Sequence, residues 1–265
     1  MGQSENMVRI SNQNAYFCPN VLGVYTADTL MRAEALALLK YQPYFAQKRV
    51  LDIGIGAGRT TIYLAPLATE YVGIDFSPTF IDHVNRTMPH VSAKLGDIRD
   101  LSDFDSAHFD FVMASFNVID FVSHDDRLKA LNDVCRVLKP GGVFVFASHN
   151  RSFELIGAAP KLETSKNPAR QLLRFMRWIR RVRNYRKLRE HWASTDEYSI
   201  VADIGNDFST LHYYIDQGTQ RQQLAKSGFS TLEVFDIFGD PVAPGVPERK
   251  SAYLTYVAQK SSSDI

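Results

Sequence analysis

Short apolar runs alternate with amphipathic stretches through the first 150 residues. The apolar runs are RVLDIG, YVGIDF, SAKLGDI, FDFVMASF and GVFVFASHN, each of strand length and bounded by turn residues. Helical spacing marks residues 27–41 and the segments TTIYLAPLA, SPTFIDHVNRTM and DDRLKALNDVCRVL. This alternation of strands and helices predicts an α/β fold with a doubly wound parallel sheet and helices on both faces.

The pattern changes after Asn150. Residues 168–192 predict a strongly basic helix, and a mixed stretch follows to about Ile215. GTQRQQLAKSGF then predicts another helix, and STLEVFDIF and SAYLTYVAQ predict two final strands.

Composition excludes several classes of protein. The chain has 265 residues, 45% of them hydrophobic, and a formal net charge of +1, so its overall charge indicates no nucleic-acid partner. Cys18 and Cys135 are far apart in the sequence, which favours a reducing compartment over a disulfide scaffold. The sequence has no CxxC motif and no histidine cluster, so it gives no sign of a structural zinc site. The polar N-terminus and the lack of a long apolar run predict no signal peptide and no membrane span, and hence a cytoplasmic protein.

The first strand runs into a glycine turn, VLDIGIGAGRTT, with Gly54, Gly56 and Gly58 two residues apart. Glycines between a strand and a helix let a ligand approach the backbone, and the helix N-terminus offers free N–H groups. Nicotinamide dinucleotides use the order G-x-G-x-x-G, whereas here Arg59 occupies the sixth place. The turn therefore predicts a cofactor loop without naming the cofactor.

Three further features add weight to the glycine turn. Asp75 ends the second strand, where a carboxylate can accept both ribose hydroxyls. Gly96-Asp97-Ile98 follows the third strand, and Lys139-Pro140-Gly141-Gly142 precedes the fifth. With Asp52, which opens the glycine motif, Asp75 and Asp97 give three carboxylates along this edge.

In this order, D-x-G-x-G-x-G, VGID, GDI and LKPGG resemble the class I S-adenosylmethionine-dependent methyltransferases. The resemblance covers roughly residues 49–150, the last helix and the two final strands. It implies a Rossmann-like seven-stranded sheet whose last strand, AYLTYVAQ, is antiparallel, with a helical lid inserted after the fifth strand. The expected segments are an N-terminal helical segment (1–48), the cofactor-binding core (49–150), the lid or substrate insertion (151–215) and the helix and strands that complete the sheet (216–260).

The resemblance also implies how the cofactor, S-adenosyl-L-methionine, is bound. The glycine loop backs its methionine and ribose parts, Asp75 binds the ribose, and Asp52 helps hold the methionine amino group. Asp97 meets the adenine amino group, while the backbone N–H of Ile98 meets a ring nitrogen. The complete set of expected cofactor-binding residues is Asp52, Gly54, Gly56, Gly58, Arg59, Asp75, Phe76, Asp97, Ile98, Ser115 and Phe116.

A hydroxyl or ammonium acceptor must lose a proton during methyl transfer, so a general base is expected near the strand ends. His149 is the first candidate because it stands just past the fifth strand. Asp120 and His124 lie beyond the fourth strand and are the other catalytic candidates. Each of the three also fits an ordinary loop residue.

The expected function is methyl transfer from S-adenosylmethionine to an oxygen or nitrogen of a small or medium-sized acceptor. The alternatives are an NAD-dependent oxidoreductase and a non-catalytic S-adenosylmethionine-binding protein. The oligomeric state stays open.

The arginine-rich segment, with its stripe of Leu172, Phe175, Ile179, Val182 and Tyr185, allows three interpretations. They are a solvated lid helix docked by that stripe, an electropositive rim for an anionic acceptor, and a membrane or nucleic-acid contact.

Overall fold

The computed structural model describes residues 7–8, 10–11 and 29–262. Cys18 and the start of the expected 27–41 helix lie outside them, and Cys135 is a partly buried free thiol. None of the helices in these residues combines the length and apolarity needed to cross a bilayer.

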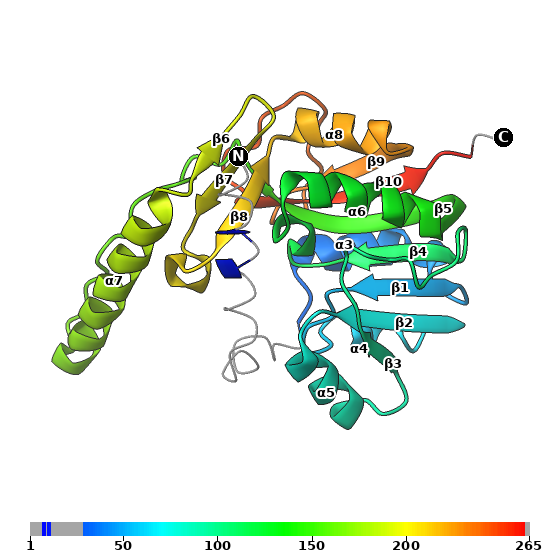
Figure 1. The fold of residues 1–265 in the computed structure, drawn as a ribbon, viewed down its shortest axis with the longest axis horizontal. Helices are drawn as coiled ribbons and strands as arrows, with labels where there is room; N and C mark the ends of the chain where they lie inside the picture. The colour runs from blue at the N-terminus through cyan, green and yellow to red at the C-terminus, as the bar shows by residue number, and fades with distance from the viewer. Residues whose placement is uncertain (1–6, 9, 12–28, 263–265) are drawn as a thin grey trace.

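Ten strands form one sheet, and seven of them make the expected core (Figure 1). Parallel pairing gives the order β3-β2-β1-β4-β5, and β10 pairs antiparallel to both β5 and β9. The predicted α/β class and the antiparallel last strand are thus confirmed. The core strands are β1 (Arg49–Ile53), β2 (Glu70–Asp75), β3 (Ser92–Leu95), β4 (Phe109–Ala114), β5 (Leu138–Asn150), β9 (Phe229–Phe235) and β10 (Tyr253–Lys260).

Successive residues of the central strands enter two different hydrophobic clusters, as a two-residue side-chain period requires. Leu51, Val112 and Phe144 pack with α6 (His124–Val137) and α8 (Gln217–Lys226) on one face. Val50, Phe111 and Val143 pack with α3 (Arg32–Lys40) and α4 (Thr61–Leu64) on the other. A further helix, α5 (Pro78–Thr87), contacts β2 and β3. The sheet therefore has helices on both faces.

The insertion adds three strands that the seven-strand expectation did not include. β8 (Leu211–Ile215) pairs parallel to the last two residues of β5, His149 and Asn150, beyond the end of the β4 pairing at Phe146, while β10 pairs with β5 from Val143 to His149. β7 (Tyr198–Ala202) and β6 (Ala193–Ser194) follow in antiparallel order. β6, β7 and β8 pair with one another as neighbours along the chain, and only the β5–β8 pairing joins distant segments.

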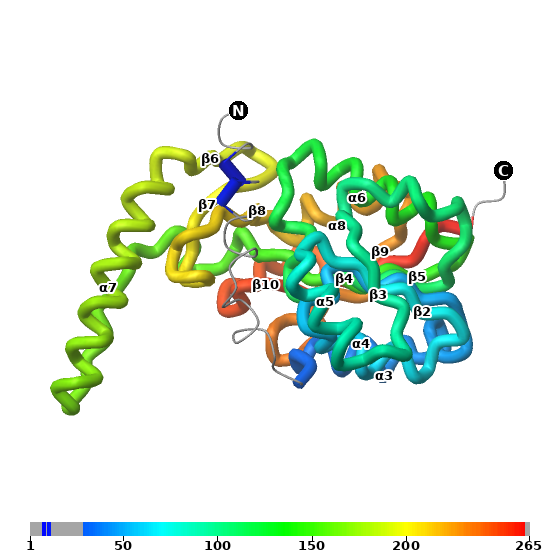
Figure 2. The backbone as a smooth tube through the Cα atoms, turned by 60° about the horizontal axis from the view of Figure 1, so that its bottom comes forward, coloured from blue at the N-terminus to red at the C-terminus, as the bar shows by residue number. Residues whose placement is uncertain are grey.

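The basic helix is α7 (Pro168–Arg189), and it projects away from the core (Figures 1 and 2). It packs mainly on β7 and on the 3₁₀ turn η4 (Gly205–Phe208), rather than over the ends of the core strands. Arg177, Arg180 and Arg181 all turn toward Asp207 of η4. The expected docking by the apolar stripe is wrong for its first half, because Leu172, Phe175 and Ile179 are exposed.

Candidate active site

The glycine loop joins β1 to α4 at the carboxyl edge of the sheet, and all three glycines have positive φ. A Cβ at Gly54 would lie 2.3 Å from Val118 Cγ2, and one at Gly58 would lie 2.8 Å from Met88 Cε. A Cβ at Gly56 would meet nothing within 4 Å. Two glycines thus allow close packing, and the middle one borders open space that a ligand can fill.

Asp75 ends β2 directly beside this loop. Its carboxylate accepts hydrogen bonds from the Gly56 amide and the Ser77 amide, each at 2.9 Å. Burial raises the pKa of Asp75 to about 6, although the two amide bonds oppose the shift. The carboxylate is thus held against the loop, at the position where the resemblance implies ribose binding.

Asp52, on β1, is completely buried. One carboxylate oxygen accepts from Thr60 Oγ1 at 2.7 Å and Tyr71 Oη at 2.9 Å, while the other has no hydrogen-bond partner. Burial raises the pKa of Asp52 to about 6. Thr60 is in the glycine loop, so Asp52 holds that loop with one carboxylate oxygen, and the second oxygen stays without a partner.

Arg59 does not point to solvent but into an ion pair that the sequence did not predict. Its guanidinium bonds Glu34 of α3 (Nη1–Oε2 2.5 Å) and Ser115 Oγ after β4 (2.6 Å). Burial disfavours the Glu34 charge, yet the bonds and charge of Arg59 and the Ser115 bond hold the pKa of Glu34 below its usual value. In the sequence, Glu34 is the single acidic residue of the apolar helix RAEALALLK. This isolated acid was the sequence feature that could have predicted a buried ion pair.

The positions that follow β2, β3 and β4 gather at the same edge. The Asp97 carboxylate accepts hydrogen bonds from Nε and Nη2 of Arg99, at 2.9 and 2.6 Å. The neighbouring Ile98 is buried. Phe76 is partly buried. Phe116 has φ of 55° and lies under the Arg59 guanidinium, 5.4 Å from its carbon, so the cation faces an aromatic ring.

His149 and Asp120 form a hydrogen-bonded pair at the end of β5. Nδ1 of His149 lies 2.8 Å from an Asp120 oxygen, which also accepts the His149 amide at 2.6 Å. Asp120 is completely buried, and its other oxygen bonds the buried guanidinium of Arg127 at 2.5 Å. Asp120 therefore positions the imidazole, and the Nε2 of His149 lies on the ring's other side, 3.4 Å from the Asn117 amide nitrogen.

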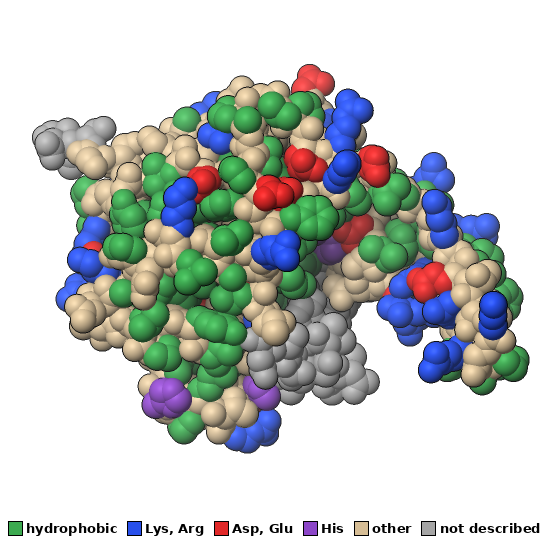
Figure 3. Space-filling model, turned by 180° about the vertical axis from the view of Figure 1, so that it is seen from behind, with side chains coloured by type: hydrophobic (Ala, Val, Ile, Leu, Met, Phe, Trp, Pro, Cys, Tyr) green, Lys and Arg blue, Asp and Glu red, His purple; other side chains and the backbone are tan. Residues whose placement is uncertain are grey.

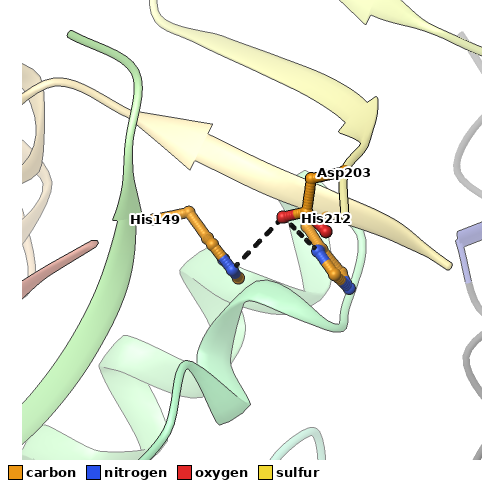
Figure 4. A group of neighbouring side chains, drawn as sticks. All are labelled: His149, Asp203 and His212. Carbon is orange, nitrogen blue, oxygen red and sulfur yellow. Dashed lines mark hydrogen bonds and ion pairs between the residues drawn. The ribbon is translucent and has the colours of Figure 1, made fainter. Parts of the chain in front are cut away.

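Tertiary structure brings Asp203 and His212 of the insertion against His149 (Figure 4). The Asp203 carboxylate lies 3.0 Å from His212 Nδ1 and 3.8 Å from His149 Nε2, and it accepts from Tyr214 Oη at 2.5 Å. Burial opposes ionisation of Asp203, but the two histidines hold its pKa below the usual range. The same carboxylate raises the pKa of His212 against the opposing effect of burial.

Two histidines and a carboxylate are also a ligand set for a metal ion. The two imidazoles, however, are stacked 8° from parallel with centroids 4.8 Å apart. A metal bound to two imidazole nitrogens lies near both ring planes, and parallel stacked rings share no such point. The observed arrangement therefore favours a carboxylate between two imidazoles, where it stabilises positive charge.

His124 lies apart from this group. Its Nδ1 is 2.8 Å from Tyr213 Oη, and its ring stacks on Tyr198. The structure thus brings His149 and Asp120 together and places the third catalytic candidate among the aromatic residues that join α6 to the insertion.

Comparisons with known proteins agree with this geometry. Residues 50–142 match the model of a methyltransferase domain. A probable S-adenosylmethionine-dependent methyltransferase of Mycolicibacterium smegmatis is 31% identical over 46% of this chain and 45% of its own length. The putative methyltransferase YqeM of Bacillus subtilis is 24% identical over 81% of this chain and 85% of its own length.

Solved structures show the same fold. The 1,6-didemethyltoxoflavin-N1-methyltransferase of Burkholderia thailandensis, solved with S-adenosylhomocysteine, aligns with a TM-score of 0.59 at 14% identity over 98% of this chain and 90% of that one. The chain spans about half the length of the first curated relatives it matches, 45% and 48%. Residues 50–142 are thus a methyltransferase domain in a chain with the fold of the S-adenosylmethionine-dependent methyltransferases, and S-adenosylmethionine is the cofactor of that domain.

Proposed function

We propose that this protein transfers a methyl group from S-adenosylmethionine to an oxygen or nitrogen of a small acceptor, with His149 as the general base. The observation that carries the proposal is the Asp120–His149 hydrogen bond of 2.8 Å at the end of β5. It fixes the proton of the neutral ring on Nδ1 and leaves the lone pair on Nε2, beside Asn117. That nitrogen is on the same edge of the sheet as the glycine loop.

The cofactor supplies an electrophilic methyl group on a positively charged sulfur. The groups that fit it are the open face at Gly56, the Asp75 carboxylate and the unpartnered oxygen of Asp52. We propose that Asp75 receives the ribose hydroxyls, and that Asp97 and the Ile98 amide receive the adenine. In this pose the cofactor occupies the open space beside Gly56.

The acceptor atom attacks the methyl carbon as the carbon–sulfur bond breaks, and the proton of the acceptor passes to His149 Nε2. The resulting imidazolium lies between two carboxylates, with Asp120 at Nδ1 and Asp203 3.8 Å from Nε2. Because both groups are largely shielded from water, their charges stabilise the imidazolium more than exposed carboxylates would. Asp203 is thereby a positioning residue for the base, together with His212.

Release of S-adenosylhomocysteine from a panel of phenols, N–H heterocycles, amines and carboxylates tests the reaction and finds the acceptor class. With the best acceptor, His149→Ala should lower kcat about 10²–10⁴-fold. The affinity for S-adenosylhomocysteine should stay nearly unchanged, because none of the proposed cofactor contacts involves this ring. His90→Ala, at an exposed histidine on the loop after α5, is the matched control.

A change at Asp203 tests whether charge beside the base matters. Asp203→Asn removes the negative charge 3.8 Å from His149 Nε2 and should lower kcat while leaving the affinity for S-adenosylhomocysteine unchanged. Full turnover in folded His149→Ala would refute the role of base while leaving the cofactor assignment intact. Failure to bind S-adenosylhomocysteine would refute the proposed pose as well.

A further inference from the structure

The first half of α7 exposes a continuous apolar face. Relative exposures are 60% for Leu172, 42% for Phe175, 58% for Met176 and 48% for Ile179. Their spacing of three and four residues puts them on one side of the helix. Side chains of this size are normally covered, and a contiguous exposed patch of them marks an interaction site.

The same helix concentrates positive charge. It contains nine of the chain's 30 lysines and arginines and none of its 29 aspartates and glutamates. Asp207 binds Arg177, Arg180 and Arg181 on the inner side. Arg183, Arg186 and Lys187 are exposed, and no carboxylate in the described part of the chain pairs with them. These three residues continue the apolar face into the last turns.

The inner side of α7 is firmly attached to the insertion. Leu188 is buried in the cluster of β7 and β8, and Tyr185 packs edge-on against Phe208 and Trp192. Asn184 donates to the Asp207 carbonyl at 3.0 Å. The C-terminal part of the helix is thus fixed to the insertion, and the helix carries the exposed face at one end of the molecule, where Figure 3 shows lysines and arginines beside apolar side chains.

We propose that α7 is a docking surface for an anionic lipid bilayer, with the helix lying in the membrane plane. An anionic membrane surface complements both halves of the face. Lipid phosphates and carboxylates pair with Arg183, Arg186 and Lys187, and the acyl boundary accepts Leu172, Phe175 and Ile179. A nucleic acid offers phosphates but no cover for four apolar side chains, and a protein partner would need a groove of matching shape.

The test is co-sedimentation of the full chain with vesicles of phosphatidylcholine alone and of phosphatidylcholine mixed with phosphatidylglycerol. Binding to the mixed vesicles, weakened by added salt, is expected. The triple variant Arg183→Gln/Arg186→Gln/Lys187→Gln should lose roughly fivefold in partitioning for each charge removed. Leu172→Gln/Phe175→Gln/Ile179→Gln should lose a similar amount without changing the net charge.

The matched control removes three positive charges elsewhere, at exposed Arg86, Lys226 and Lys250, as Gln variants. It should bind vesicles as the wild type does. An unchanged affinity for S-adenosylhomocysteine shows that each variant is folded.

Four results would overturn the proposal. Two are no binding to the mixed vesicles, and equal binding by both α7 variants and the wild type. A dimer in sedimentation velocity that the apolar variant dissociates would assign the face to a second copy of the chain. Tight binding to duplex DNA that the apolar variant retains in full would assign it to nucleic acid instead.

Discussion

The core at residues 49–150 and the insertion at 151–215 both place acidic side chains in largely buried positions, but they treat the charge in opposite ways. In the core, burial raises the pKa of Asp52 and Asp75 to about 6, and their bonds come from neutral amides and hydroxyls. In the insertion, Asp203 faces two histidines and Asp207 faces three arginines, so the pKa of each is lowered.

This contrast distinguishes acids kept for a ligand from acids that hold the fold. A buried carboxylate without a cation costs stability, and such a cost persists where a ligand uses the group. The charge of a carboxylate that is paired with cations is already compensated, so such a residue can hold its neighbours in place without a ligand. Asp52 and Asp75 are accordingly the better candidates for cofactor contact, whereas Asp203 and Asp207, like Asp120 of the core with its partner Arg127, hold other groups in position.

The strongest way to break the comparison is at Asp75. Asp75→Ala removes the proposed ribose contacts, each charge-assisted bond being worth about 1.5–3 kcal/mol, so S-adenosylhomocysteine affinity should fall roughly 100-fold or more in calorimetry. Wild-type affinity should also fall as the pH drops through about 6, where the carboxylate takes up a proton. Asp110→Ala, at the opposite end of β4, is the control, and an equal loss there would contradict the ribose assignment.

The next test is the stability cost of Asp52 in the cofactor-free protein. Its native pKa of about 6 exceeds the ordinary 3.8, so the folded state binds the proton more tightly and the free energy of unfolding falls as pH rises from 3.8 to about 6. Asp52→Asn lacks this penalty. The free energy of unfolding of Asp52→Asn, measured with urea, should therefore rise relative to that of the wild type as the pH increases, by at most about 3 kcal/mol above pH 6. A difference independent of pH would show that Asp52 is not the titrating group.

Substituting alanine for two glycines of the same loop should cost different amounts of stability, although the sequence motif treats the two glycines alike. Gly54→Ala adds a Cβ 2.3 Å from Val118 at φ of 72°, and should cost about 2–4 kcal/mol of stability. Gly56→Ala meets no neighbour and should cost about 1 kcal/mol, the strain of a positive φ alone. Thermal unfolding measures both, and equal losses would mean that the loop relaxes away from Val118.

The smallest expected effect lies in the insertion. Asp207→Asn removes the carboxylate that binds Arg177, Arg180 and Arg181, of which the first two are mostly exposed, so the loss of stability should be about 1–2 kcal/mol and should shrink in high salt. Cofactor affinity should not change. Hydrogen exchange along α7 would locate the loss, and increased exchange in the glycine loop instead would show that the two regions are coupled.

The sequence by itself determined the core of this protein. Its signals there are local: a glycine turn that needs positive φ, Asp75 at a strand end, and alternating strands and helices whose connections favour parallel pairing. Asp75 bonds Ser77 two residues away and Gly56 in the preceding loop, so a short segment contains most of the geometry. His149 and Asp120 could be proposed because both follow strands that end at the same edge.

Only the tertiary structure decided the rest, because the deciding contacts join distant segments. Glu34 reaches Ser115 across 81 residues, and Asp203 and His212 reach His149 only because β8 pairs with the end of β5. The helical spacing of α7 predicted an apolar inner face, but in the first half of the helix the apolar side chains are exposed, and Arg177, Arg180 and Arg181 meet Asp207 of the insertion instead. A periodic pattern reports which residues share a helix face, whereas the choice of which face turns inward depends on what the remaining chain places opposite.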